Sequence, residues 1–325
     1  MLVVSRPHPP AGPEEAAQPV AEAAAAPTTQ PAAAPAPAVA APAVAAIAAS
    51  AVASSPTGFH PPPRSAIPAG PLGDEIRRGE AIFRHTGAEA PQFVGNTLSC
   101  SNCHLEGGRL ADAAPLWAAW VAFPAYRAKN HHVNTFAERM QGCFRFSMNG
   151  KAPPTDSKVL VALQTYSAWL AKGAPVGAAM AGRGYPKLAK PASAPDYARG
   201  QKVYAAHCAL CHGENGEGRV AGGQTVFPPL WGPHSYNWGA GMTSIVNAAG
   251  FVKANMPLGL GNTLSDQDAW DVAAYLDSQE RPQDPRFTGN VAETRKKFHD
   301  SPSSMYGLTV NGHVLGSDSV PPGGK

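Results

Sequence analysis

The chain has 325 residues, of which 15% are charged, and its formal net charge at pH 7 is only +3. Nucleic-acid binding requires a strongly basic surface, and so small an excess of positive charge does not indicate one, so no nucleic-acid partner is expected. Five cysteines are too few for a disulfide-dense scaffold, and an odd number cannot pair completely. The cysteines are therefore expected to serve chemistry rather than cross-linking.

Alanine and proline dominate residues 1–65, which contain almost no large apolar side chain. Such a segment cannot bury enough apolar surface to offset its ordering entropy, so we expect a disordered leader. Its longest proline-free apolar run, residues 43–55, is too short for a bilayer, and no membrane span is expected. Only Ala51-Val52-Ala53 resembles part of an export signal, namely the cleavage site.

Two segments after the leader share one layout. Each opens with a short helix that carries an Arg-Gly pair, Arg78-Gly79 in the first and Arg199-Gly200 in the second. Each continues with a C-x-x-C-H motif, a loop-rich middle and a late amphipathic helix, and neither contains a convincing run of alternating strand residues. The sequence therefore predicts an all-α fold with a degenerate internal repeat.

Composition sets the domain boundaries that we expect. The stretch between the two copies is rich in Gly, Ala and Pro, and the chain turns polar after Pro282. The expected order is a leader at 1–65, a first domain at 70–173, a linker at 174–194, a second domain at 195–282 and an irregular extension at 283–325.

The C-x-x-C-H motifs are Cys100-Ser-Asn-Cys103-His104 and Cys208-Ala-Leu-Cys211-His212. In this pattern two thiols bond to the haem vinyl groups and the histidine reaches the iron, so two covalent haem c groups are predicted. A zinc ribbon or a redox cysteine pair is the plainer interpretation, but neither explains a histidine at the same offset in both copies. Haem attachment of this kind implies assembly outside the cytoplasm, and a periplasmic location is expected.

Each iron needs a sixth ligand unless that position is left open for substrate. In the second copy we expect Met256, which precedes Pro257 and would give His/Met ligation. In the first copy Met148 stands as far beyond its histidine as Met256 does, and it competes with Cys143, the odd cysteine. Spacing and composition leave Met148, Cys143 and an open position as alternatives.

A capping box at Thr135-Phe-Ala-Glu138 predicts a short helix that begins there and ends at Gly142. Arg139, Cys143 and Ser147 follow one another at intervals of four residues and are expected to project similarly.

Arg127 and Lys129 lie in the preceding loop and add positive charge. Taken singly, such cations are usually solvated, but their crowding before an unpaired cysteine favours a charged edge of a haem pocket.

These residues resemble the dihaem thiosulfate dehydrogenases and tetrathionate reductases of sulfur-metabolising bacteria. The similarity covers roughly residues 70–315 and leaves out only the leader. The matching motifs are Glu138-Arg139-Met-Gln-Gly142-Cys143-Phe144, Ser147-Met148-Asn149-Gly150, Phe227-Pro-Pro-Leu230-Trp231, Ser235-Tyr236-Asn237, Gly239-Ala-Gly-Met242, Lys253-Ala-Asn-Met256-Pro257 and Ser304-Met-Tyr306 with the residues up to Gly312.

This resemblance implies two class I cytochrome c domains. It implies that His104 and Cys143 ligate the first haem iron and that His212 and Met256 ligate the second. Met148 then becomes a core or pocket residue. Some members of the family carry a lysine just before the axial methionine as an alternative ligand, but this chain has Asn255 there, so that ligand exchange is not expected.

The resemblance also implies a reaction. Two thiosulfates are coupled into tetrathionate with release of two electrons, or the reverse occurs, beside the cysteine-ligated haem. Arg127, Arg139 and Ser147 would surround the substrate, with Lys129 as an alternative to Arg127, and Cys143 could leave the iron and bond to sulfur. Electrons would pass through the second haem to an external carrier, by default another c-type cytochrome.

Two other functions are weighed against this one. A dihaem electron carrier without a substrate site would use Met148 as ligand and would leave Cys143 inert. Another sulfur-handling cytochrome with a cysteine-ligated haem would pass sulfur to a carrier protein.

Overall fold

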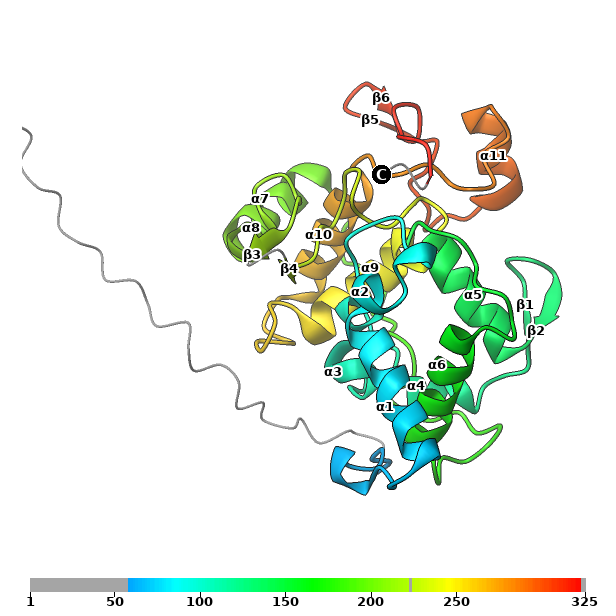
Figure 1. Ribbon diagram of the computed structural model, residues 1–325. Helices are drawn as coiled ribbons and strands as arrows, with labels where there is room; N and C mark the ends of the chain where they lie inside the picture. The colour runs from blue at the N-terminus through cyan, green and yellow to red at the C-terminus, as the bar shows by residue number, and fades with distance from the viewer. Residues whose placement is uncertain (1–57, 222–223, 323–325) are drawn as a thin grey trace, which may run out of the picture. The chain divides into compact units, whose positions relative to one another are not determined.

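The computed structural model describes residues 58–221 and 224–322. The expectations for residues 1–57 lie outside this part of the chain. Helices dominate the described residues (Figure 1). The α-helices are α1 (Pro71–Arg84), α2 (Thr86–Glu89), α3 (Leu105–Gly108), α4 (Leu116–Trp120), α5 (Phe136–Phe146), α6 (Lys158–Leu170), α7 (Tyr197–His207), α8 (Ala209–His212), α9 (Ile245–Asn255), α10 (Asp266–Asp277) and α11 (Val291–Phe298). Single 3-10 turns are η1 (Arg64–Ala66), η2 (Pro91–Phe93), η3 (Cys100–Asn102) and η4 (Gly241–Thr243).

The helical framework agrees with the prediction, but the described residues also contain three antiparallel hairpins. They are β1 (Ala125–Arg127) with β2 (His132–Asn134), β3 (Arg219–Ala221) with β4 (Gln224–Phe227), and β5 (Thr309–Val310) with β6 (His313–Val314). Each strand has two to four residues, which is too short for a period-two pattern to be detected. A strictly all-α fold was therefore a slight oversimplification.

A glycine allows each pair of long helices to pack closely. α1 lies against α6, and α7 lies against α10 (Figure 1). A methyl group on Gly79 would lie 2.2 Å from the Ala162 carbonyl oxygen, and one on Gly200 would lie 2.0 Å from the Asp271 carbonyl oxygen. The glycine of the Arg-Gly pair that marked both copies in the sequence thus allows the first helix of each copy to approach the last closely.

Replacing Gly200 by alanine is expected to lower the free energy of unfolding by about 1–3 kcal/mol, because the two backbones must move apart. The midpoint of guanidinium unfolding of the haem-loaded protein measures this change. Gly142→Ala is the matched control, since it is also a helical glycine and its added methyl would meet no atom within 4 Å. A control variant as unstable as Gly200→Ala would contradict the packing argument.

The apolar core lies around the first helix pair. Trp117 and Tyr166 are fully buried, and the Tyr166 hydroxyl donates to the Gly107 carbonyl oxygen at 2.8 Å. The same cluster includes Tyr236 from the second copy, so the two copies share part of one core. None of the described helices is both long enough and apolar enough to cross a membrane.

Both ends of the described chain are more ordered than composition indicated. Phe59 packs on Trp117 at a centroid distance of 5.2 Å, so the last residues of the expected leader belong to the fold. Residues 283–322, expected to be irregular, contain helix α11 and the β5–β6 hairpin. Tyr306 and Leu315 from this segment are buried against Trp238, and this small apolar cluster explains why the polar segment folds.

Candidate active site

The first C-x-x-C-H motif folds as the turn η3 followed by His104. A capping box between Ser99 and Asn102 fixes the turn, so Cys100 and Cys103 are held on one short segment. The His104 Nδ1 atom lies 2.6 Å from the Ala114 carbonyl oxygen. Burial lowers the pKa of His104 to about 4, which keeps the ring neutral. Its Nδ1 carries the proton towards Ala114, and Nε2 is left as the free lone pair.

The second motif has the same arrangement. His212 closes helix α8, and its Nδ1 lies 2.9 Å from the Pro228 carbonyl oxygen. Burial lowers the pKa of His212 as well. Met256 follows the end of α9 and packs, together with Cys208, against the apolar cluster around Tyr204.

Both histidines therefore meet a requirement that metal-ligating imidazoles share, a backbone carbonyl that binds the second ring nitrogen. Within residues 58–221 and 224–322 no group of three or more His, Cys, Asp or Glu side chains could hold a metal ion, and no disulfide joins the five cysteines. A zinc ribbon needs four such ligands in one place. The donor sets fit haem c.

A cavity of about 440 Å³ lies beside the first motif. This volume is typical of a site for a cofactor-sized ligand. Cys100, Cys103 and His104 line it, and so do both candidate sixth ligands, Cys143 and Met148. The structure thus places Cys143 and Met148 at the same cavity, and the choice between them depends on chemistry.

Helix α5 carries the unpaired cysteine. Thr135 caps it through the predicted box with Glu138, but the helix continues through Gly142 to Phe146. The expected stop at Gly142 was wrong. A glycine inside a helix costs only about 1 kcal/mol, and the burial of Phe144 beyond it outweighs that cost, because a buried phenylalanine contributes about 1.5–3 kcal/mol.

The longer helix keeps three predicted side chains at one cavity. Arg139 Nη1 donates to Cys143 Sγ at 2.8 Å, and Ser147, which caps the end of α5, also lines the cavity. Arg127 reaches the same cavity from strand β1. Burial lowers the pKa of Arg127, and the nearby Arg139 charge adds to this effect. A guanidinium charge that is destabilised in this way favours a bound anion.

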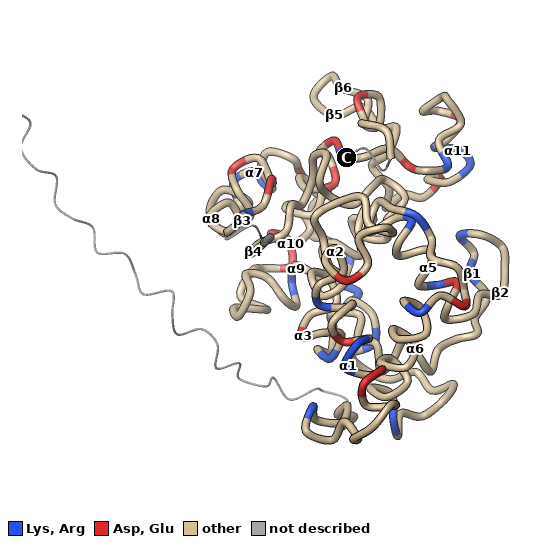
Figure 2. The backbone as a smooth tube through the Cα atoms, viewed as in Figure 1, with Lys and Arg blue, Asp and Glu red and all other residues tan. Residues whose placement is uncertain are grey.

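Lys129, the alternative to Arg127, lies elsewhere and is not among the residues that line the cavity. Its ammonium group donates to the Gly239 carbonyl oxygen and lies 4.4 Å from the centroid of the Phe146 ring. Burial, together with the charge of Arg286, lowers the pKa of Lys129 to about 8. Lys129 thus fastens the β1–β2 hairpin instead of facing the cavity. Basic residues lie along this hairpin and along α5 (Figure 2).

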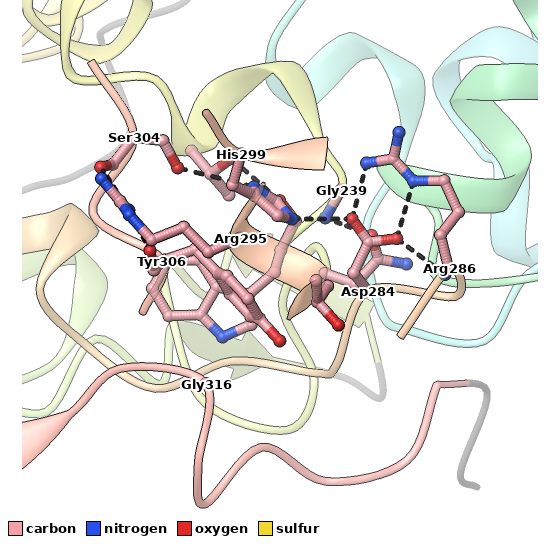
Figure 3. A network of polar contacts seen from close by, with 12 residues as sticks. Gly239, Asp284, Arg286, Arg295, His299, Ser304, Tyr306 and Gly316 are labelled. Carbon is pink, nitrogen blue, oxygen red and sulfur yellow. Dashed lines mark hydrogen bonds and ion pairs between the residues drawn. The ribbon is translucent and has the colours of Figure 1, made fainter. Parts of the chain in front are cut away.

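Residues of the C-terminal segment pack against the end of α5, the helix that carries Cys143. Asp284 accepts two hydrogen bonds from the Arg286 guanidinium group, at 3.0 and 2.6 Å, and lies 2.9 Å from His299 Nε2 (Figure 3). Burial alone would raise the pKa of Asp284, but the hydrogen bonds from His299 and Arg286 outweigh burial and lower it. Arg286 in turn lies 5.0 Å from the Phe146 ring. A compensated ion pair therefore packs against the end of the cysteine helix.

A second set of contacts holds the end of α5. The fully buried Asn237 donates to the Arg145 carbonyl oxygen at 3.0 Å and to Asn149 Oδ1 at 2.9 Å. Asn96 donates to the Ser147 carbonyl oxygen at 2.8 Å. These amides satisfy carbonyl groups that a helix end leaves without partners.

Sequence reasoning missed part of the cavity wall. Arg183 and Tyr185 come from the segment treated as a linker, and Met242 and Asn247 come from the second copy. Burial raises the pKa of Tyr185 well above its usual value. The only signal was an arginine and a tyrosine in a stretch otherwise rich in Gly, Ala and Pro.

The cytochrome c family model matches residues 197–280. The thiosulfate dehydrogenase of Thiomonas intermedia (strain K12) is 61% identical over 263 residues, which cover 81% of this chain and 84% of the relative. That of Stutzerimonas stutzeri (strain A1501) is 53% identical over 260 residues, which cover 79% and 85%. The chain belongs to the thiosulfate dehydrogenase family.

The solved structure of thiosulfate dehydrogenase (TsdBA) from Marichromatium purpuratum, in its "as isolated" form, is similar to this chain with a TM-score of 0.77 and 56% sequence identity. The match covers 80% of this chain and 57% of that one, so this chain spans just over half the length of the Marichromatium protein. As a c-type cytochrome of this family, the chain binds haem c covalently.

Proposed function

We propose that this chain is a dihaem thiosulfate dehydrogenase, which couples two thiosulfates to tetrathionate or catalyses the reverse reduction. Two class I cytochrome c domains, at 70–173 and 195–282, would hold one haem each. His104 and Cys143 would ligate the first iron, and His212 and Met256 the second. Haem c supplies storage for one electron at each site, which matches a reaction that releases two.

The contact between Arg139 and Cys143 carries this proposal. A dianion placed about 4 Å from a thiolate is repelled by roughly 8 kcal/mol at an effective dielectric constant near 20. Arg139 and Arg127 at the same cavity offset this repulsion. A guanidinium can donate two parallel hydrogen bonds to oxygens of a sulfonate group, as it does to carboxylate and phosphate. Ser147 adds a hydroxyl donor.

The proposed reaction passes through a covalent adduct on the Cys143 sulfur. Cys143 would leave the iron, and its thiolate would bond to the outer sulfur of a first thiosulfate to give an S-thiosulfonate on Cys143. The two electrons released in this step would be taken up by the two haems, one each. The outer sulfur of a second thiosulfate then attacks the adduct sulfur that is bonded directly to Cys143. The S–S bond to Cys143 breaks, tetrathionate leaves, and the thiolate is restored. The arginines neutralise the charge of both anions throughout.

The second site suits electron exit. The Lys253 ammonium group donates to the Leu264 carbonyl oxygen at 2.6 Å and pairs with Asp266 at 3.1 Å, so it is already bound away from Met256. This contact supports Met256 as the ligand. A thioether raises the potential of a haem relative to a thiolate, so electrons would move from the first haem to the second. An external c-type cytochrome in the periplasm would accept them.

A turnover assay tests the proposed function. The purified haem-loaded protein should reduce an artificial electron acceptor when thiosulfate is added, with one tetrathionate formed for every two electrons and no carrier protein present. Reduction that requires a sulfur-carrier protein would favour the other sulfur-handling function. If the protein neither oxidises thiosulfate nor reduces tetrathionate, only the electron-carrier function would remain.

A further inference from the structure

The loop at residues 112–114 has an unusual backbone. Asp112 and Ala114 have φ angles of 62° and 49°, in the left-handed region that non-glycine residues seldom adopt. Residues in this conformation are strained and persist only where the surroundings hold them. The loop also contains the Ala114 carbonyl oxygen, which accepts the hydrogen bond from His104. Any contact that keeps this loop in place therefore also keeps the Ala114 carbonyl oxygen against His104.

The segment between the two copies holds one side of the loop. The backbone amides of Asp112 and Ala114 donate to the carbonyl oxygens of Gly182 and Gly184, both at 2.7 Å. These two bonds hold the loop through its backbone amides. The Asp112 carbonyl oxygen can then accept a hydrogen bond from another donor.

Asn255 is that donor. Its side-chain amide donates to the Asp112 carbonyl oxygen at 3.1 Å and to the Phe251 carbonyl oxygen, also at 3.1 Å. Asn255 is 6% exposed and is the last residue of α9, directly before Met256. Both amide protons are thus used, one within its own helix and one on the strained loop.

We propose that Asn255 is a positioning residue for the first haem site. It holds the 112–114 loop so that Ala114 accepts the His104 proton, and it thereby couples the ligand segment of the second haem to the histidine of the first. This inference rests on the proposed function, which assigns His104 and Met256 as iron ligands. A well-placed acceptor makes the imidazole a stronger electron donor and favours oxidised iron.

Asn255→Ser tests this coupling. A serine hydroxyl can still bond to the Phe251 carbonyl oxygen four residues earlier, but it cannot reach Asp112. In the haem-loaded variant, the reduction potential of the first haem should shift to a more positive value. Asn255→Ala should give the same shift and serves as the second variant if serine disturbs folding.

Thr263→Ala is the matched control. The Thr263 hydroxyl donates to the Leu260 carbonyl oxygen at 2.7 Å, so this change weakens the loop after Met256 and leaves residues 112–114 untouched. It should move the potential of the second haem at most. If the Asn255 variants also move only the second potential, or neither, the coupling is refuted.

A rescue variant separates positioning from a general loss of structure. Glycine adopts a positive φ without strain, so adding Asp112→Gly to Asn255→Ser should bring the first potential back towards that of the parent. No recovery would show that Asn255 does not act through this loop. Failure of the proposed function itself would appear in the parent protein, which would then lack a thiolate-ligated haem.

Discussion

Replacement of Cys143 by glycine is expected to abolish thiosulfate turnover while both haem groups stay attached. Attachment uses Cys100, Cys103, Cys208 and Cys211, so it does not need the fifth cysteine. Without the thiolate no sulfur adduct can form, and the rate should fall by roughly a thousandfold or more, as when other enzymes lose their nucleophile. Steady-state assays on protein with verified haem content measure this loss.

Met148→Leu is the control for Cys143→Gly. Met148 lines the same cavity and is the ligand in the electron-carrier alternative. Leucine conserves its volume, so the packing cost should stay below about 1.5 kcal/mol. The variant should keep the thiolate signature of the first haem and a measurable turnover. The account would be contradicted if Cys143→Gly kept its turnover, or if the first haem lost its sixth ligand in Met148→Leu. Either result would make Met148 the ligand and Cys143 the pocket residue.

Replacement of Arg139 is expected to have the second largest effect. The guanidinium donates to Cys143 Sγ and lines the substrate cavity, so Arg139→Ala removes a charged hydrogen bond worth about 1.5–3 kcal/mol. This corresponds to a decrease of about 10- to 150-fold in kcat/KM for thiosulfate. Arg139→Lys keeps the charge but loses the planar fork, so its value should lie between those of the parent and the alanine variant.

Arg145→Ala provides the matched control on the same helix. Arg145 is exposed and does not line the cavity, yet its removal changes the net charge of the protein equally. Its kcat/KM should stay within about twofold of the parent, because exposed charges contribute little at physiological ionic strength. Equal losses in Arg139→Ala and Arg145→Ala would mean that overall charge, and not the contact with Cys143, attracts thiosulfate.

The sequence predicted the parts of the site whose spacing is fixed by local chemistry. The C-x-x-C-H motifs are set by covalent bonds to one haem, and the capping box at Thr135 is set by contacts within four residues. The spacing of Arg139 and Cys143 also survives as a direct contact, because both lie on one helix.

Parts that depend on distant segments were not predictable from local patterns. Arg183 and Tyr185 reach the cavity only because the segment between the copies folds back along the 112–114 loop. The continuation of α5 beyond Gly142 depends on burial of Phe144, which a local rule for glycine does not include. The contact between Asn255 and Asp112 joins residues 143 positions apart.

The ligand of the first haem iron is the central claim. Electron paramagnetic resonance of the fully oxidised, haem-loaded protein reports it most directly. We predict one low-spin haem with the signature of histidine and thiolate ligands and a second with that of histidine and methionine. Two histidine–methionine haems, with no thiolate signal, would contradict the account.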